Sequence, residues 1–157
     1  MSDGVIRIVA NGKPVPQGSI RSLGAGRPSV HGNADRLLPW RDTIIAATQA
    51  AMIEYGWERN EGPCSVYGTF YFDRPKSHYT SKGALKPDAP RWPITRANGD
   101  LDKLQRAFGD AITAAGAIKD DSQIAAWNVT KEYVKSDGFA GTWRHPCADL
   151  QLRSLEP

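Results

Sequence analysis

The chain has 157 residues, a formal net charge of +3 and a hydrophobic fraction of 40%. These values are typical of a soluble globular protein, and we expect residues 1–157 to form a single domain. They exclude a strongly basic, histone-like binder, and no stretch reaches the roughly 20 apolar residues of a membrane span. The mild excess of basic residues permits a nucleic-acid partner without requiring one.

Two strands and one helix are predicted in the first third of the chain. Residues 5–9 alternate in polarity and predict a strand, and residues 29–31 predict a short second strand. Residues 39–55 carry apolar side chains at helical spacing, so they predict a helix. We expect Pro39 at its first position and Gly56 just beyond its end.

A strand and a long basic segment follow. Residues 64–72 predict a strand with two distinct faces. Residues 74–99 contain four prolines and are expected to form a long functional loop. The basic residues of this loop would follow a DNA backbone: Arg74, Lys76, Lys82, Lys86, Arg91 and Arg96. Tyr79 and Trp92 could stack on unpaired bases. The alternative is that these charges only make the surface soluble.

The last third of the chain predicts a second helix and two strands. The apolar stripe of the helix comprises Leu104, Ala107, Phe108, Ala111, Ile112 and Ala115. Residues 122–134 predict a strand, residues 136–146 a turn-rich loop, and residues 148–155 a final strand. Together, the predicted elements indicate a mixed α/β (α+β) fold.

Carboxylates gather around the second predicted helix. Asp100 and Asp102 stand where the loop enters the helix, and two anions so close favour a cation between them. Mg²⁺ is suited to such a site because it takes few protein carboxylates and is completed by water and phosphate. Asp120 and Asp121 follow the other end of the helix, so a third carboxylate could join the first two. The alternatives are that the first pair caps the helix and the second forms a solvated turn.

Two cations accompany these carboxylates. Arg106 follows Asp102 by four residues, one helical turn, so we expect it to face the same site and to hold a phosphate oxygen. Lys103 is a further candidate for binding phosphate. The arrangement predicts metal-assisted hydrolysis of a phosphodiester.

This part of the chain resembles a known family. The run Gly-Asp-Leu-Asp-Lys-Leu-Gln-Arg at 99–106, Asp-Ala-Ile at 110–112, Asp-Asp-Ser-Gln-Ile at 120–124 and Lys131 resemble the RusA endonucleases, the Holliday-junction resolvases of phages and prophages. The family pattern is Asp-x-Asp-Asn-Leu before a helix carrying Asp-Ala-Leu, then Asp-Asp-x-Gln-Ile or Val, then a lysine on the next strand. The combined pattern is specific, although no single piece of it is.

The resemblance implies a set of roles for individual residues. Asp100, Asp102 and Asp121 would be the catalytic carboxylates and bind Mg²⁺, for which Mn²⁺ can substitute. Arg106 takes the place of a catalytic lysine, and Asp120 would support the ligands from behind. Lys131 joins Lys103 and the basic loop as a DNA-binding residue.

The resemblance also implies an assembly, a substrate and a location. A small mixed sheet flanked by two main helices would form a homodimer, because a four-way junction offers two strands related by a two-fold axis. The enzyme would resolve Holliday junctions by paired symmetric nicks during DNA recombination and repair. With only two cysteines and no secretion signal, it is expected in the cytoplasm of a bacterium or a phage-infected host.

This sequence departs from the family pattern at three positions, where Lys103 replaces Asn, Gly99 replaces Pro and Arg106 replaces Lys. Arginine keeps the charge but changes its geometry. Three alternatives therefore remain: a nuclease acting on flaps or forks, a branched-DNA-binding protein of the same fold that does not cut, and a small hydrolase of nucleotides.

Overall fold

The computed structural model describes residues 4–18, 20–21, 24–26, 30–31, 33–135 and 143–157. Its centre is a four-stranded sheet in the order β1-β6-β4-β5. The β4–β5 pair is parallel, whereas β6 runs antiparallel to both β1 and β4, so the sheet is mixed as predicted. The strands are β1 (Val5–Asn11), β4 (Cys64–Phe72), β5 (Ile124–Tyr133) and β6 (Cys147–Ser154).

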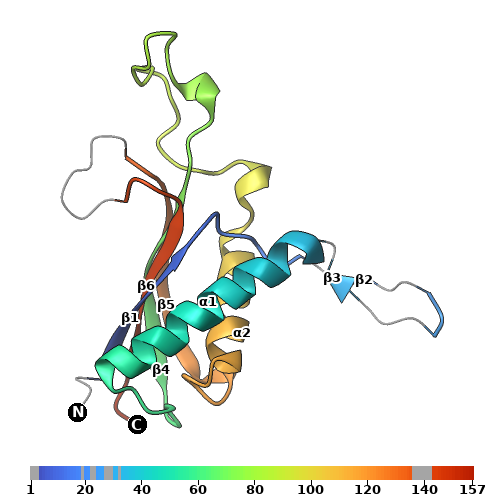
Figure 1. The fold of residues 1–157 in the computed structure, drawn as a ribbon, viewed down its shortest axis with the longest axis vertical. Coiled ribbons are helices and arrows are strands. Elements are labelled where there is room, and N and C mark those ends of the chain that lie inside the picture. Colours follow the sequence, from blue (N-terminus) through green and yellow to red (C-terminus); the bar gives the residue numbers. More distant parts are fainter. Residues whose placement is uncertain (1–3, 19, 22–23, 27–29, 32, 136–142) are drawn as a thin grey trace.

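Helices α1 (Ala34–Tyr55) and α2 (Leu101–Ala114) lie together on one face of this sheet (Figure 1). The buried core lies between the two layers, and its largest fully buried side chains include Phe70, Phe72 and Phe108. The opposite face of the sheet carries polar pairs, such as Arg7 with Asp149 at 2.7 Å. The predicted α+β class with two main helices is therefore confirmed.

The expected position of Pro39 is wrong. Helix α1 begins at Ala34 after Asn33, so Pro39 lies in its second turn rather than at its first position. A proline there removes only the hydrogen bond to the carbonyl of Asp35. Both residues are exposed, so water can satisfy that carbonyl and the helix continues.

The basic segment is an arm that projects from the end of the sheet (Figure 1). It contains two short 3-10 turns, η1 (Lys76–His78) and η2 (Arg96–Asn98), and an isolated bridge pairs Tyr79 with Leu85. A second projection carries the two-residue strands β2 (Ile20–Arg21) and β3 (Val30–His31). Of the predicted loop at 136–146, residues 136–142 lie outside the described part of the chain. No helix in the described ranges could cross a membrane.

The contact between β4 and β6 depends on Gly68. Its φ is 142°, and a Cβ there would overlap the backbone oxygen of Asp149 and lie 2.8 Å from the Cα of Leu150. We expect Gly68→Ala to lower the free energy of unfolding by about 3 kcal/mol, because backbone must move in the central pair of the sheet. Thermal unfolding should shift downwards by roughly 6–12 °C. Gly116→Ala is the control, since Gly116 has φ 86° but open space around it. Equal shifts in both variants would contradict the steric explanation.

Candidate active site

Asp100 stands at the N-cap position of α2 but does not cap the helix. Its backbone is extended, with φ −76° and ψ 143°, yet its carboxylate accepts no hydrogen bond from the first turn. The side chain is 71% exposed and lies 3.4 Å from the ammonium group of Lys103. A pair this exposed contributes little stability. The carboxylate is therefore available to a ligand at the positive end of a helix.

Asp102, Arg106 and Gly109 follow one another along one face of α2, since they are spaced by four and three residues. The side chains of Asp102 and Arg106 are exposed, whereas Gly109 is buried. The stripe opposite, which includes Leu104, Phe108 and Ile112, lies in the core and fixes the helix in place. The helix thus places Asp102 and Arg106 on one face, and the role of Arg106 in binding phosphate stays a prediction.

Asp121 packs against this same face of α2 at Gly109. The residue begins η3 (Asp121–Gln123), a short 3-10 turn before β5. A Cβ placed on Gly109 would lie 3.5 Å from the Cβ of Asp121 and 3.7 Å from the ring of Trp127. The missing side chain of Gly109 thus lets η3 pack directly on the helix. Asp121 contacts the helix two turns beyond Asp102, roughly 10 Å along its axis.

The neighbouring Asp120 forms hydrogen bonds within its own turn. Its carboxylate accepts a 2.9 Å hydrogen bond from the backbone N–H of Ser122 and caps η3. Hydrogen bonding from the Ser122 side chain, together with this bond from its backbone N–H, lowers the pKa of Asp120. Asp120 therefore shapes the turn that carries Asp121, and its support of a metal ligand stays a prediction.

Asp102 and Asp121 lie on one face of α2 about two turns apart, and Asp100 stands at the N-cap, so the three aspartates do not form one tight cluster. Within the described ranges, no group of three His, Cys, Asp or Glu side chains is close enough to hold one metal ion. The donors themselves suit a hard cation such as Mg²⁺, because all three are exposed carboxylates. The chemistry of the donor set fits the ion, and Asp100 and Asp102 are the pair nearest to each other in sequence.

Lys131 holds the loop that leads into Asp100. It lies on β5, and its ammonium group donates a 2.8 Å hydrogen bond to the carbonyl of Gly99. Burial lowers the pKa of Lys131, and the nearby charge of Asp100 opposes that effect. Its expected contact with DNA stays a prediction, since the structure shows a lysine bonded to the loop.

The start of the chain also packs against this loop. A Cβ on Gly99 would lie 2.5 Å from Cγ of Pro16, so only glycine fits there. The backbone N–H of Gln17 donates a 3.0 Å hydrogen bond to the carbonyl of Lys103. These contacts join residues more than 80 positions apart, and nothing in the local sequence pattern signals them.

Two arginines of the arm are engaged within the protein. The guanidinium of Arg74 lies 4.4 Å from the ring centroid of Tyr133 and donates a 2.7 Å hydrogen bond to the carbonyl of Pro90. Arg91 lies over the ring of Trp92 at 4.7 Å and forms a 3.6 Å ion pair with Glu132. Both arginines brace the arm against β5.

The remaining arm cations, Lys76, Lys82, Lys86 and Arg96, are exposed. Where the arm leaves the sheet, a cavity of about 500 Å³ is lined by residues that include Arg74, Tyr79, Lys86, Arg91 and Lys135. Lys135 was absent from the sequence-based candidates, because it follows the end of β5 rather than belonging to the arm. The cavity combines cations with an aromatic ring, a combination that suits phosphate and base together.

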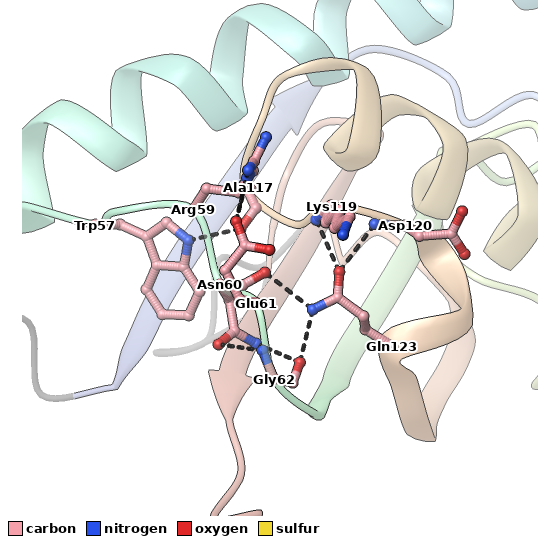
Figure 2. Close-up of polar contacts among 9 residues, drawn as sticks. All are labelled: Trp57, Arg59, Asn60, Glu61, Gly62, Ala117, Lys119, Asp120 and Gln123. Carbon is pink, nitrogen blue, oxygen red and sulfur yellow. Dashed lines mark hydrogen bonds and ion pairs between the residues drawn. The ribbon is translucent and has the colours of Figure 1, made fainter.

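Sequence reasoning also gave no role to Gln123. Its side-chain amide forms four hydrogen bonds, two with the backbone of residues 119–120 and two with the loop after α1 (Figure 2). The signal in the sequence that could have pointed to Gln123 is its place in the Asp-Asp-x-Gln motif at residues 120–123.

A family of known proteins matches most of this chain. The model of the family described as endodeoxyribonuclease RusA matches residues 12–139, which include the arm, α2 and all three aspartates. Among curated proteins, none matches the chain significantly. The match covers most of the 157 residues, and the chain therefore belongs to the RusA endodeoxyribonuclease family.

Proposed function

We propose that the protein is a metal-dependent endodeoxyribonuclease that resolves Holliday junctions by paired symmetric nicks, within DNA recombination and repair. The observation that carries the proposal is the face of α2. It presents Asp102 and Arg106, Asp100 stands at the start of the helix, and the absence of a side chain at Gly109 lets Asp121 pack on the same face. The basic arm ends directly before Asp100, so bound DNA would meet this face.

Asp100, Asp102 and Asp121 would hold Mg²⁺, for which Mn²⁺ can substitute. A bound divalent ion supplies Lewis acidity toward a phosphodiester and lowers the pKa of water. Arg106 would bind a non-bridging phosphate oxygen, since its guanidinium offers paired donors to phosphate. The backbone N–H groups at the start of α2 favour the same anion. Asp120 would shape the turn behind Asp121.

DNA would follow the arm and the cavity at its base. Lys76, Lys82, Lys86 and Arg96 are exposed and would neutralise phosphates, whereas Arg74 and Arg91 keep the arm in place. Lys103 and Lys131 would approach the backbone near the cleavage site. Tyr79 lines the cavity and Trp92 is 46% exposed beside Arg91, so both rings offer surface for stacking on unpaired bases.

A homodimer would present two such sites. A four-way junction contains two strands related by a two-fold axis, and a C2 dimer would place one site on each. The same proposal takes residues 1–157 as one domain. It also places the protein in the cytoplasm of a bacterium or a phage-infected host, because Cys64 and Cys147 are buried free thiols that suit a reducing compartment.

A second candidate is a protein that binds branched DNA without cutting it. The ion pair between Lys103 and Asp100 favours it, because the lysine replaces a neutral asparagine of the family pattern and competes with a metal ion for the carboxylate. The two functions differ in cleavage and not in binding.

Cleavage should be measured on four-way junctions, flaps, forks and linear duplex, each with Mg²⁺, Mn²⁺ or EDTA. Binding to junctions without product in either metal would establish the second candidate. Preferred cutting of flaps or forks would identify these structures, and not the four-way junction, as the substrate.

Lys86→Ala is expected to weaken junction binding and to reduce its salt dependence. Each phosphate contact contributes about 0.9 to the slope of log K against log salt concentration, so the slope should fall by about that amount. Fluorescence anisotropy with a labelled junction in EDTA measures both effects. Arg153→Ala is the control, because Arg153 is an exposed cation on β6 that pairs with Ser65, at the end of β4 opposite the start of the arm. An unchanged slope for Lys86→Ala would remove Lys86 from the DNA path.

A further inference from the structure

The side chain of Gln123 uses all of its hydrogen-bonding capacity. Its Oε1 accepts from the backbone N–H groups of Lys119 at 2.7 Å and Asp120 at 2.8 Å. Its Nε2 donates to the carbonyls of Asn60 at 2.9 Å and Gly62 at 2.7 Å (Figure 2). A primary amide has two donors and two acceptor lone pairs, so no group is left over.

The loop that receives these bonds is itself fixed to the core. The backbone N–H of Asn60 donates to the carbonyl of Ala117 at 3.0 Å, and Ser154 donates to the side-chain oxygen of Asn60 at 3.2 Å. The indole N–H of Trp57 donates to the same Ala117 carbonyl at 2.9 Å (Figure 2). Asn60 thus links the end of α1, the end of α2 and β6, and it offers a rigid anchor.

Asp121 lies between this anchor and α2. On one side, Gln123 bonds the turn at 119–120 to the loop at 60–62; on the other, Gly109 allows the Cβ of Asp121 to pack on the helix. The Asp121 side chain is exposed, and among the described residues no side chain forms a hydrogen bond or ion pair with it, so this backbone framework sets its direction. A metal ligand needs a rigid mount, because small displacements lower affinity steeply.

We propose that Gln123 is a positioning residue that fixes Asp121 as a ligand for the divalent ion. This inference rests on the proposed function, in which Asp121 binds that ion. Gln123 touches neither substrate nor metal and acts through the turn. Other side chains cannot replace it: a glutamate cannot donate to the two carbonyls, and a methionine has neither donors nor comparable acceptors.

The test compares Gln123→Met with Gln151→Met. Gln151 is a half-buried glutamine on β6 that accepts a hydrogen bond from Tyr67 on the opposite face of the sheet, so it controls for loss of a buried amide. Affinity for Mn²⁺ alone is measured from the free-ion EPR signal during titration of the whole protein. We expect Gln123→Met to weaken Mn²⁺ binding about tenfold or more, as for residues that orient metal ligands, and Gln151→Met to leave it unchanged.

Two further readouts separate positioning from stability. The metal concentration for half-maximal cleavage should rise in Gln123→Met, with the rate recovering at high Mn²⁺, while junction affinity in EDTA stays the same. Gln123→Asn, which keeps the amide but is one methylene shorter, should give a smaller shift in the same direction. Unchanged Mn²⁺ affinity in a folded Gln123→Met or Gln123→Asn protein would overturn the inference.

Failure of the inference can be distinguished from failure of the proposed function. Wild-type protein and Asp121→Asn are titrated alongside. If Asp121→Asn loses Mn²⁺ binding and Gln123→Met does not, only the part assigned to Gln123 is wrong. If wild type does not bind Mn²⁺, or Asp121→Asn binds and cuts like wild type, the metal site itself is wrong and the inference falls with it.

Discussion

Replacing Asp102 with Asn is expected to slow junction cleavage by at least about 10³-fold, which corresponds to roughly 4 kcal/mol of lost transition-state stabilisation. Asparagine keeps the size of the side chain but removes the charge that would hold a divalent ion. Asp102 is exposed on the first turn of α2, so the substitution should leave the fold intact. Single-turnover cleavage with Mg²⁺ measures the rate, and Asp100→Asn and Asp121→Asn should behave alike.

DNA binding by the same variants should be unchanged. Most contacts to DNA are made to phosphates, here by the arm, and not by the carboxylates. Junction affinity in EDTA is the measurement. Asp110→Asn is the control for loss of a carboxylate on the same helix, because Asp110 is half-buried and is not one of the three proposed ligands. Full cleavage activity in Asp102→Asn would refute the site assignment, whereas equal losses in Asp110→Asn would point to a general effect on α2.

Gly99→Ala should have the second-largest effect, on stability and cleavage together. Gly99 has φ 80°, and an added Cβ would lie 2.5 Å from Cγ and 2.6 Å from Cβ of Pro16. Crowding and backbone strain should lower the free energy of unfolding by about 2–4 kcal/mol. The loop carrying Asp100 would be displaced, and a shift of about 1 Å can cost 10²-fold in rate. Chemical denaturation and single-turnover cleavage measure the two effects.

Two controls isolate the contact with Pro16. Gly83 in the arm has a similar φ of 82° but nothing within 4 Å, so Gly83→Ala reports backbone strain alone. Adding Pro16→Gly to Gly99→Ala removes the clash and should restore part of the lost stability, as a double-mutant cycle would show. The family's proline is expected to fail here as well, because proline requires φ near −65°. A stable and active Gly99→Pro protein would contradict this description of the loop.

The elements nearest the site could be predicted because their signals are local. The apolar stripe of α2 and the position of Asp100 at its start follow from spacing within one helix. The alternation in residues 64–72 likewise placed Phe70 and Phe72 in the core. Pro39 was misplaced because the residues before it do not continue the apolar stripe strongly. The buried Leu37, three residues before Trp40, is the one apolar residue of that stretch that packs in the core, and the helix begins at Ala34.

The supporting contacts could not be predicted because they join distant parts of the chain. The contact of Pro16 with Gly99 and the bond from Lys131 to Gly99 depend on how β1 and β5 lie relative to the arm. The links from Gln123 to residues 60–62 depend on the parallel pairing of β4 with β5. A sequence pattern can indicate which residues carry chemistry, whereas the contacts that hold those residues in place depend on tertiary packing.

The most direct test of the proposed activity is a cleavage assay on a labelled four-way junction beside a linear duplex of the same sequence, with Mg²⁺ and with EDTA. Each strand is labelled in turn so that the positions of the nicks can be mapped. We predict paired nicks at symmetric positions in the junction alone, abolished by EDTA and absent in Asp102→Asn. Tight binding without any product in Mg²⁺ or Mn²⁺ would contradict a nuclease and identify a protein that binds branched DNA without cutting it.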